Sequence, residues 1–159
     1  MESGFTTIQP KDATAPIDPS LKVTRWMSKT VYSVHPDSKL IDAVEIMMEH
    51  RIRHVPVLDG DRLVGIISDR DVRNTLPRKN EMQQLPEISC RGSLNRRASV
   101  AMTRYPITIP VDFSIHEAAE IMCREKIGAL PVMDVGRMVG ILSAEDLLWA
   151  LTQLTAPRP

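Results

Sequence analysis

Residues 65–71 read Gly-Ile-Ile-Ser-Asp-Arg-Asp, and residues 140–146 repeat the pattern as Gly-Ile-Leu-Ser-Ala-Glu-Asp. In each copy a short apolar run ends in a serine, and an aspartate follows three residues later. This spacing predicts a strand that passes into a helix, with the serine as the N-cap. The same turn aims backbone N–H groups and a hydroxyl at one point, which is how chains bind phosphate. The motif therefore predicts both a fold and a ligand site.

The chain around this motif repeats with an offset of 75 residues and no gap. The matched pairs include Met27 with Met102, Val34 with Ile109, Pro56 with Pro131 and Gly65 with Gly140. Apolar, proline and glycine positions that match in this number without a gap indicate an internal duplication.

Each copy predicts the order strand, helix, strand, strand, helix. In the first copy these elements are expected at about 31–34, 38–50, 55–58, 63–67 and 69–76. Two helices on a three-stranded sheet would leave one sheet face open, and about 50 residues alone would be marginally stable. We therefore expect an α+β fold in which two pseudo-symmetric β-α-β-β-α repeats pack sheet to sheet.

Proline-rich and basic stretches place the boundaries between the segments. We expect a flexible N-terminal tail at 1–21, repeat one at 22–76, a basic linker at 77–99, repeat two at 100–152 and a C-terminal tail at 153–159. The linker is either a solvated connection or a loop that folds over an anion or docks a partner.

Composition excludes several classes of function. The chain has 20 basic and 20 acidic residues and only 4% aromatic residues, so it is not expected to bind membranes or nucleic acids in general. Cys90 and Cys123 form no CxxC pair, and the N-terminus has no apolar signal region, which favours a cytoplasmic protein with reduced thiols. Cys123 falls on the apolar stripe of its helix and is expected to be buried.

No metal-ligand spacing, P-loop, dinucleotide fingerprint or catalytic triad is visible, so we expect neither a metal, nor a catalytic cofactor, nor an enzyme.

The order and spacing of these motifs resemble a tandem pair of cystathionine-β-synthase (CBS) domains, or Bateman module, of the stand-alone kind. The resemblance covers about residues 22–152. It is carried by the motifs at 65–71 and 140–146, the Met-Ser and Met-Thr openings at 27 and 102, the turns at 34–37 and 109–112, and the segments 53–57 and 128–132. It implies a regulatory module that binds AMP, ADP, ATP, NAD or S-adenosylmethionine between the repeats, AMP or ATP foremost. It also implies a homodimer through the repeat helices, for which the methionine-rich first helices are suited, and a regulated partner protein of unknown identity.

The resemblance also implies roles for individual residues. Asp71 and Asp146 would hold the ribose hydroxyls, and Ser68 and Ser143 would lie near phosphate. Arg53, His54 and Arg70 would neutralise the phosphate, and Ser33 and Thr108 would contact the base or the sugar. Two physical arguments support these roles independently: a carboxylate accepts hydrogen bonds from a cis-diol, and arginine binds phosphate bidentately.

The two repeats differ in charge at the predicted phosphate positions. Repeat two has Gly128, Ala129 and Glu145 where repeat one has Arg53, His54 and Arg70. Because Glu145 would repel phosphate, we expect one phosphate-competent cleft and one that is weak, empty or suited to a less charged ligand. Three alternatives stay open: the serines and aspartates act only as helix caps, the module is an interaction module with vestigial clefts, or the basic linker binds nucleic acid.

Overall fold

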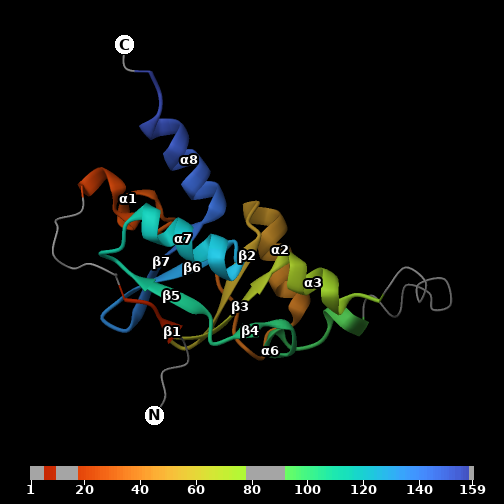
Figure 1. The fold of residues 1–159 in the computed structure, drawn as a ribbon. Helices are drawn as coiled ribbons and strands as arrows, with labels where there is room; N and C mark the ends of the chain where they lie inside the picture. Colours follow the sequence, from red (N-terminus) through yellow and green to blue (C-terminus); the bar gives the residue numbers. More distant parts are fainter. Residues whose placement is uncertain (1–5, 10–17, 78–91, 158–159) are drawn as a thin grey trace. The chain divides into compact units, whose positions relative to one another are not determined.

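The computed structural model describes residues 6–9, 18–77 and 92–157, and it confirms the α+β class (Figure 1). The described residues form two compact units. Unit one spans Tyr32–Pro106, and unit two combines Thr6–Val31 with Ile107–Pro159. Most of the predicted basic linker, residues 78–91 with Cys90, lies outside the described residues.

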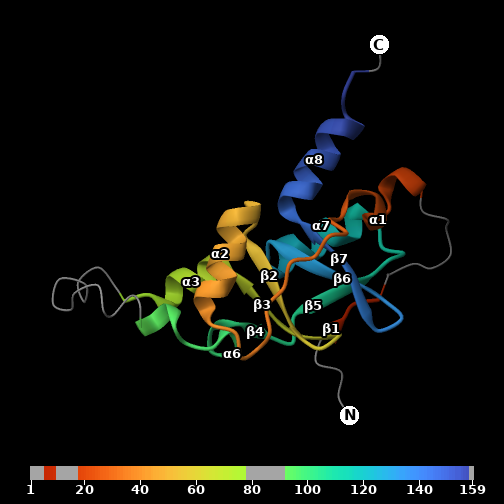
Figure 2. The same cartoon turned by 180° about the vertical axis from the view of Figure 1, so that it is seen from behind.

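Unit one is a three-stranded sheet with helices, seen in both views of the ribbon (Figures 1 and 2). Its elements are α2 (Leu40–His50), β2 (His54–Asp59), β3 (Arg62–Ser68), α3 (Asp69–Thr75), α6 (Ala98–Ala101) and β4 (Thr103–Arg104), with strand order β2-β3-β4. Its core consists of Val34, Leu40, Ala43, Met47, Val55, Val57, Ile67 and Ala98. The alternation of buried and partly exposed residues along β3 shows a strand with one face on this core.

Unit two repeats this plan around a four-stranded sheet. Its elements are β1 (Thr6–Thr7), η1 (Pro19–Leu21), α1 (Val23–Trp26), β5 (Ile107–Pro110), α7 (Ile115–Glu125), β6 (Ala129–Asp134), β7 (Arg137–Ser143) and α8 (Ala144–Leu154), with strand order β1-β5-β6-β7. Its core includes Val23, Ile109, Phe113, Ala118, Ile121, Met122, Leu130, Val132 and Leu142. Thr6 and Thr7 fall within the segment that the sequence predicts as a tail.

The strand registers show the duplication directly. His54 pairs with Ser68 as Ala129 pairs with Ser143, and every other β2–β3 pair has its β6–β7 equivalent 75 residues later. The irregularity in the hairpin also recurs, after Val57 and after Val132. The predicted first strand at 31–34 is reduced to one parallel bridge, Val34 with Val57, which matches the pairing of Ile109 with Val132 in β5–β6.

Each unit contains the segment that precedes the other repeat in sequence. The strand β4 pairs with β3 in unit one, with Thr103 opposite Ile66. In unit two Ser28 takes the equivalent place, where its N–H donates to the Ile141 carbonyl at 2.9 Å and its own carbonyl accepts from the Ile141 N–H at 3.0 Å. The sequence groups 22–31 with repeat one, whereas these residues belong to the compact unit of repeat two.

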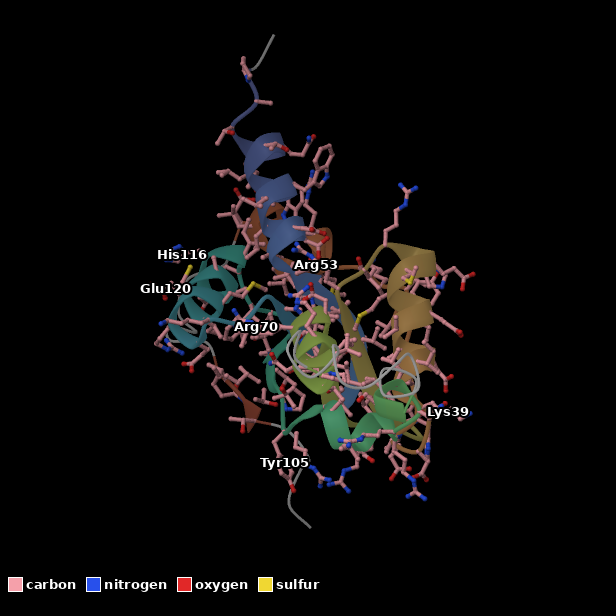
Figure 3. The ribbon with its side chains drawn as sticks, turned by 90° about the vertical axis from the view of Figure 1, so that its right-hand side faces the viewer. Lys39, Arg53, Arg70, Tyr105, His116 and Glu120 are labelled. Atoms are coloured by element: carbon pink, nitrogen blue, oxygen red, sulfur yellow. The ribbon has the colours of Figure 1, made fainter. Side chains whose placement is uncertain are left out.

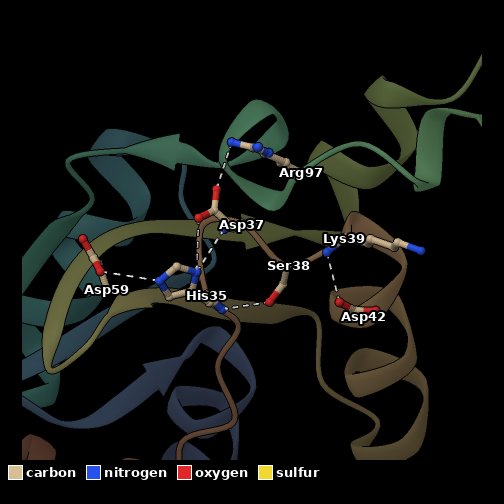
Figure 4. A network of polar contacts seen from close by, with 7 residues as sticks. All are labelled: His35, Asp37, Ser38, Lys39, Asp42, Asp59 and Arg97. Carbon is tan, nitrogen blue, oxygen red and sulfur yellow. Dashed lines mark hydrogen bonds and ion pairs between the residues drawn. The ribbon is translucent and has the colours of Figure 1, made fainter.

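A network of polar contacts connects α6 to the turn before α2 (Figure 4). The Arg97 guanidinium lies 3.1 Å from the Asp37 carboxylate, and the Ala98 N–H donates to the Ser38 carbonyl at 2.7 Å. In the same turn the Asp37 N–H donates to Nδ1 of His35 at 3.2 Å. These contacts place Ala98 in the core of unit one.

The two glycines that open the motifs are needed for close packing. A Cβ atom on Gly65 would lie 2.9 Å from Cγ of Met102, and one on Gly140 would lie 2.7 Å from Sδ of Met27. Neither glycine has a positive φ, so space rather than backbone conformation demands glycine there. The methionine of each opening therefore packs on the glycine of the other repeat's motif.

The expectation that Cys123 is buried is wrong, because its side chain is exposed. The helix α7 buries Ala118, Ile121 and Met122, and Cys123 lies one position beyond this stripe, about 100° further round the helix.

Candidate functional site

The motif serine and aspartate of unit one form a capping box at the start of α3. Oδ2 of Asp71 accepts hydrogen bonds from the Ser68 N–H at 2.8 Å and from the Ser68 hydroxyl at 2.6 Å. In return the Asp71 N–H donates to Oγ of Ser68 at 3.3 Å. The helix start is thereby satisfied locally, as the spacing in the sequence predicts.

Unit two builds the same box at the start of α8. Oδ2 of Asp146 accepts from the Ser143 N–H and from the Ser143 hydroxyl, both at 2.7 Å, and the Asp146 N–H donates to Oγ of Ser143 at 3.2 Å. The cap role of both serines and both aspartates is thus observed, and a ligand role would have to be added to it.

The first N–H groups of α3 are already occupied. The Asp69 N–H donates to the Arg53 carbonyl at 3.0 Å, and the Asp71 N–H is held by Ser68. The backbone N–H of Arg70 lies near the Asp69 carboxylate and contributes to lowering the pKa of Asp69. The backbone of this helix start is therefore not an open anion cradle, and a phosphate here has to be bound by side chains.

The capping box leaves one acceptor of Asp71 available. The box uses only Oδ2, and Oδ1 accepts no hydrogen bond from any described residue. A carboxylate oxygen has two lone pairs, so Oδ1 can accept from the two hydroxyls of a ribose. By contrast, the Ser68 hydroxyl already donates its proton to Asp71, so it can offer a ligand only its acceptor side.

The predicted phosphate residues of repeat one lie around this helix start. Figure 3 shows Arg53 and Arg70 near the beginning of α3, and both are exposed. His54 begins β2 directly opposite Ser68 and is half-buried. The structure therefore brings Arg53, His54 and Arg70 to the same end of the β2–β3 hairpin as the capping box.

An acidic residue that the sequence did not single out lies among these cations. The Asp69 carboxylate contacts Nη1 of Arg73 at 2.7 Å, one helical turn away. Desolvation by burial raises the pKa of Asp69, but the hydrogen bond and charge of Arg73, the Arg70 N–H and the nearby charge of Arg53 outweigh it and lower that pKa. The i,i+4 spacing of Asp69 and Arg73 was a readable signal for this pair.

Repeat two has the same backbone without the cations. The Ala144 N–H donates to the Gly128 carbonyl at 2.9 Å, which is the equivalent of the bond from Asp69 to Arg53. Gly128 and Ala129 provide no charge, and Glu145 is exposed. The charge difference predicted from the sequence therefore falls on positions with equivalent backbone hydrogen bonds.

The predicted base or sugar residues differ in exposure. Ser33 is half-buried, whereas Thr108 is fully buried. The Thr108 hydroxyl bonds the Thr7 hydroxyl at 2.8 Å and the Thr6 carbonyl at 3.4 Å, so β1 lies over it. Thr7 is a residue that the sequence did not predict at this site, since nothing in a short polar segment near the N-terminus signals a strand.

Two classes of site receive no support from the described residues. No group of three or more His, Cys, Asp and Glu residues among them could hold a metal ion. No helix in the described parts of the chain is long and apolar enough to cross a membrane.

Comparison with known proteins identifies a family. The model of the CBS domain matches residues 23–78 and again residues 98–153. A CBS domain-containing protein of Dictyostelium discoideum is 35% identical over 145 residues, which cover 86% of this chain and 95% of the relative. The solved structure of CBSX2 in complex with AMP has a TM-score of 0.69 and 27% identity, and the match covers 84% of this chain and 98% of CBSX2. The CBS domain pair of protein MJ0100, solved with 5′-methylthioadenosine and S-adenosylmethionine, has a TM-score of 0.67 and 27% identity over 82% of this chain and 98% of that one.

Proposed function

This chain belongs to the CBS-domain family, and on that premise we propose that it is a regulatory module that binds an adenosine-containing ligand and modulates a partner protein. Two of the structures it resembles were solved with AMP and with 5′-methylthioadenosine and S-adenosylmethionine. We further propose that the chain has no catalytic activity and that it acts in the cytoplasm.

The observation that carries the proposal is the divided use of the Asp71 carboxylate. Oδ2 is fixed by two hydrogen bonds from Ser68, and this fixes the direction in which Oδ1 points. An acceptor that is oriented in advance loses little side-chain entropy when it binds a cis-diol. Asp71 would thus hold the ribose while the capping box holds Asp71.

The charges of repeat one indicate a phosphorylated ligand such as AMP, ADP or ATP. Arg53 and Arg70 are exposed beside the capping box, and arginine pairs with phosphate through two parallel hydrogen bonds. Asp69 lowers the net positive charge there and would compete for the same cations. We therefore expect a monophosphate or polyphosphate to bind at repeat one, and Asp146 to serve a ligand without phosphate at repeat two.

Regulation would follow from linkage. A ligand that binds one conformation of the module more tightly than another shifts the population toward it, and the partner protein responds to that shift. The size of the response is bounded by the difference in the ligand's affinity for the two conformations.

A thermal-shift screen with AMP, ADP, ATP, NAD and S-adenosylmethionine tests the proposal. A ligand present at 100 times its Kd should add about 2.7 kcal/mol to the free energy of unfolding. In Asp71→Asn the amide can still accept from Ser68 through its oxygen, but it then presents an NH₂ donor where the ribose needs an acceptor. The stabilisation by nucleotide should be lost in Asp71→Asn and kept in the matched variant Asp146→Asn. If no ligand stabilises the wild-type chain, the clefts are vestigial and the module serves interaction alone.

We also propose a homodimer, with a contact that differs from the one expected through the first helices. Of the methionines in the first helices, Met47 and Met122 are buried in the two cores, and only Met48 is exposed, at 76%. Large apolar side chains are exposed instead along α8, namely Leu148, Trp149, Leu151 and Leu154. An exposed apolar patch of this kind marks a surface that binds another protein. We therefore place the dimer contact on α8.

A further inference from the structure

One strand of unit two has no equivalent in unit one. The strand β1 pairs in parallel with β5, placing Thr6 opposite Ile107 and Thr7 opposite Thr108 (Figure 1). The equivalent residues of repeat one, Tyr32 and Ser33, pair with no described strand. All pairs of the β2–β3 hairpin recur in β6–β7, and the β3–β4 and β5–β6 pairings each have at least one counterpart in the other unit, so β1 is an addition to the duplicated plan.

The contacts of β1 converge on Thr108. The Ile8 N–H donates to the Thr108 carbonyl at 3.1 Å, and the Thr7 and Thr108 hydroxyls lie 2.8 Å apart. The Thr108 hydroxyl donates to the Thr6 carbonyl at 3.4 Å. With Thr7 donating to it, Thr108 uses its single proton and accepts one hydrogen bond, and its exposed fraction is 0%.

The state of Thr108 differs from that of Ser33, which is half-buried. Thr108 cannot contact a ligand through its hydroxyl unless β1 leaves. The attachment of β1 is short, since it comprises two strand residues, with Ile8 packed at the edge of the core. Short segments with few buried apolar contacts are the first to open in folded proteins.

We propose that the segment Thr6–Ile8 is an intramolecular occupant of the repeat-two site, which a ligand must displace to reach Thr108. This inference rests on the proposed function. Because repeat two lacks the arginines and carries Glu145, the displacing ligand is an adenosine compound without phosphate, with its ribose on Asp146. Repeat one binds the nucleotide whether or not β1 is attached.

Titration calorimetry with AMP and, separately, with 5′-methylthioadenosine tests the occupant. The variant Ile8→Pro removes the N–H that donates to Thr108 and detaches β1. Thr7→Val removes only the hydroxyl contact and serves as a second variant should Ile8→Pro fold poorly by circular dichroism. Thr6→Val is the matched control, because the Thr6 side chain is exposed and its carbonyl is unchanged.

The expected result is that Ile8→Pro and Thr7→Val bind 5′-methylthioadenosine at least tenfold more tightly than the wild type and Thr6→Val do. AMP should bind all four proteins at one site with the same affinity. A synthetic peptide of residues 2–12, added to Ile8→Pro, should weaken the binding of 5′-methylthioadenosine again.

Two results would overturn the inference, and they are distinguishable. If AMP binds every protein once and 5′-methylthioadenosine binds all four alike, β1 is an ordinary edge strand, and the proposed function stands. If no protein binds either compound, the proposed function fails and the occupant fails with it.

Discussion

Replacing Gly65 by alanine tests how the two repeats exchange their opening segments. The new Cβ atom would meet the Met102 side chain at Sδ and at Cγ, the latter at 2.9 Å, and would also lie 3.1 Å from Cβ of Met102. Contacts with Cβ and Cγ cannot be relieved by turning only the end of the side chain, so β4 has to shift on β3. Overpacking of this kind costs about 1–3 kcal/mol. The backbone itself accepts alanine, because φ at Gly65 is not positive.

A double-mutant cycle isolates the clash. Gly65→Ala and Met102→Ala should each destabilise unit one, and the double variant should be more stable than the sum predicts by about 1–2 kcal/mol. Gly92→Ala is the control, since the added Cβ meets no atom within 4 Å apart from its own chain neighbours and helix backbone, and it should not destabilise the chain. The assay is urea unfolding followed by circular dichroism, with the free energy extrapolated at constant slope.

The equivalent variants in repeat two provide a comparison for this experiment. A Cβ on Gly140 would also lie 3.0 Å from the Ser28 carbonyl oxygen, a backbone atom that Met27→Ala does not remove. The rescue of Gly140→Ala by Met27→Ala should therefore be smaller than the rescue in unit one. Additive effects in the Gly65 and Met102 cycle would refute the packing of Met102 on Gly65.

Further predictions concern the hairpin, the caps, the ion pair and the dimer. Val135 is a β-branched residue at φ 42°, where repeat one has Gly60, so Val135→Gly should raise the free energy of unfolding by about 1 kcal/mol, and Gly60→Val should lower it. Ser143→Ala removes the N-cap of α8 and should cost about 1 kcal/mol by urea unfolding. The lowered pKa of Asp69 means that its stabilisation is present above its ordinary pKa of 3.8 and is lost as pH falls through the lower folded value. Asp69→Asn should thus destabilise the chain by about 0.3–0.5 kcal/mol at pH 7 and show no difference near pH 2. Trp149→Glu should convert a dimer to a monomer in light scattering, whereas Glu49→Gln, on α2, should leave the mass unchanged.

The duplication could be predicted from the sequence because its signals are local. Ser68 and Asp71 announce the capping box by spacing alone, and Pro77 explains why α3 ends at Thr75 whereas α8 continues to Leu154. The offset of 75 residues then transfers each element to the second copy, down to the irregularity after Val57 and Val132.

The features that could not be predicted depend on distant contacts. Ser28 pairs with Ile141 and β4 pairs with β3, and no local pattern tells which repeat an opening segment joins. The strand β1 forms through contacts such as the hydrogen bond between Thr7 and Thr108, which are 101 residues apart in the sequence. Cys123 lies beside the buried stripe of α7, where a shift of one position changes a buried residue into an exposed one.

The same limit applies to the candidate site. The residue types were readable from the motif. The separate roles of the two carboxylate oxygens of Asp71 were not, because they depend on which oxygen the capping box uses. For Asp69 the i,i+4 spacing to Arg73 was readable, whereas its closeness to Arg53 was not, because the fold brings that residue from another element.

The most direct test of ribose binding by Asp71 is titration calorimetry of AMP into the wild-type chain, Asp71→Asn and Asp146→Asn under identical conditions. We expect one AMP site in the wild type and in Asp146→Asn, and at least a tenfold loss of AMP affinity in Asp71→Asn. Equal AMP affinity in the wild type and Asp71→Asn would contradict ribose binding by Asp71.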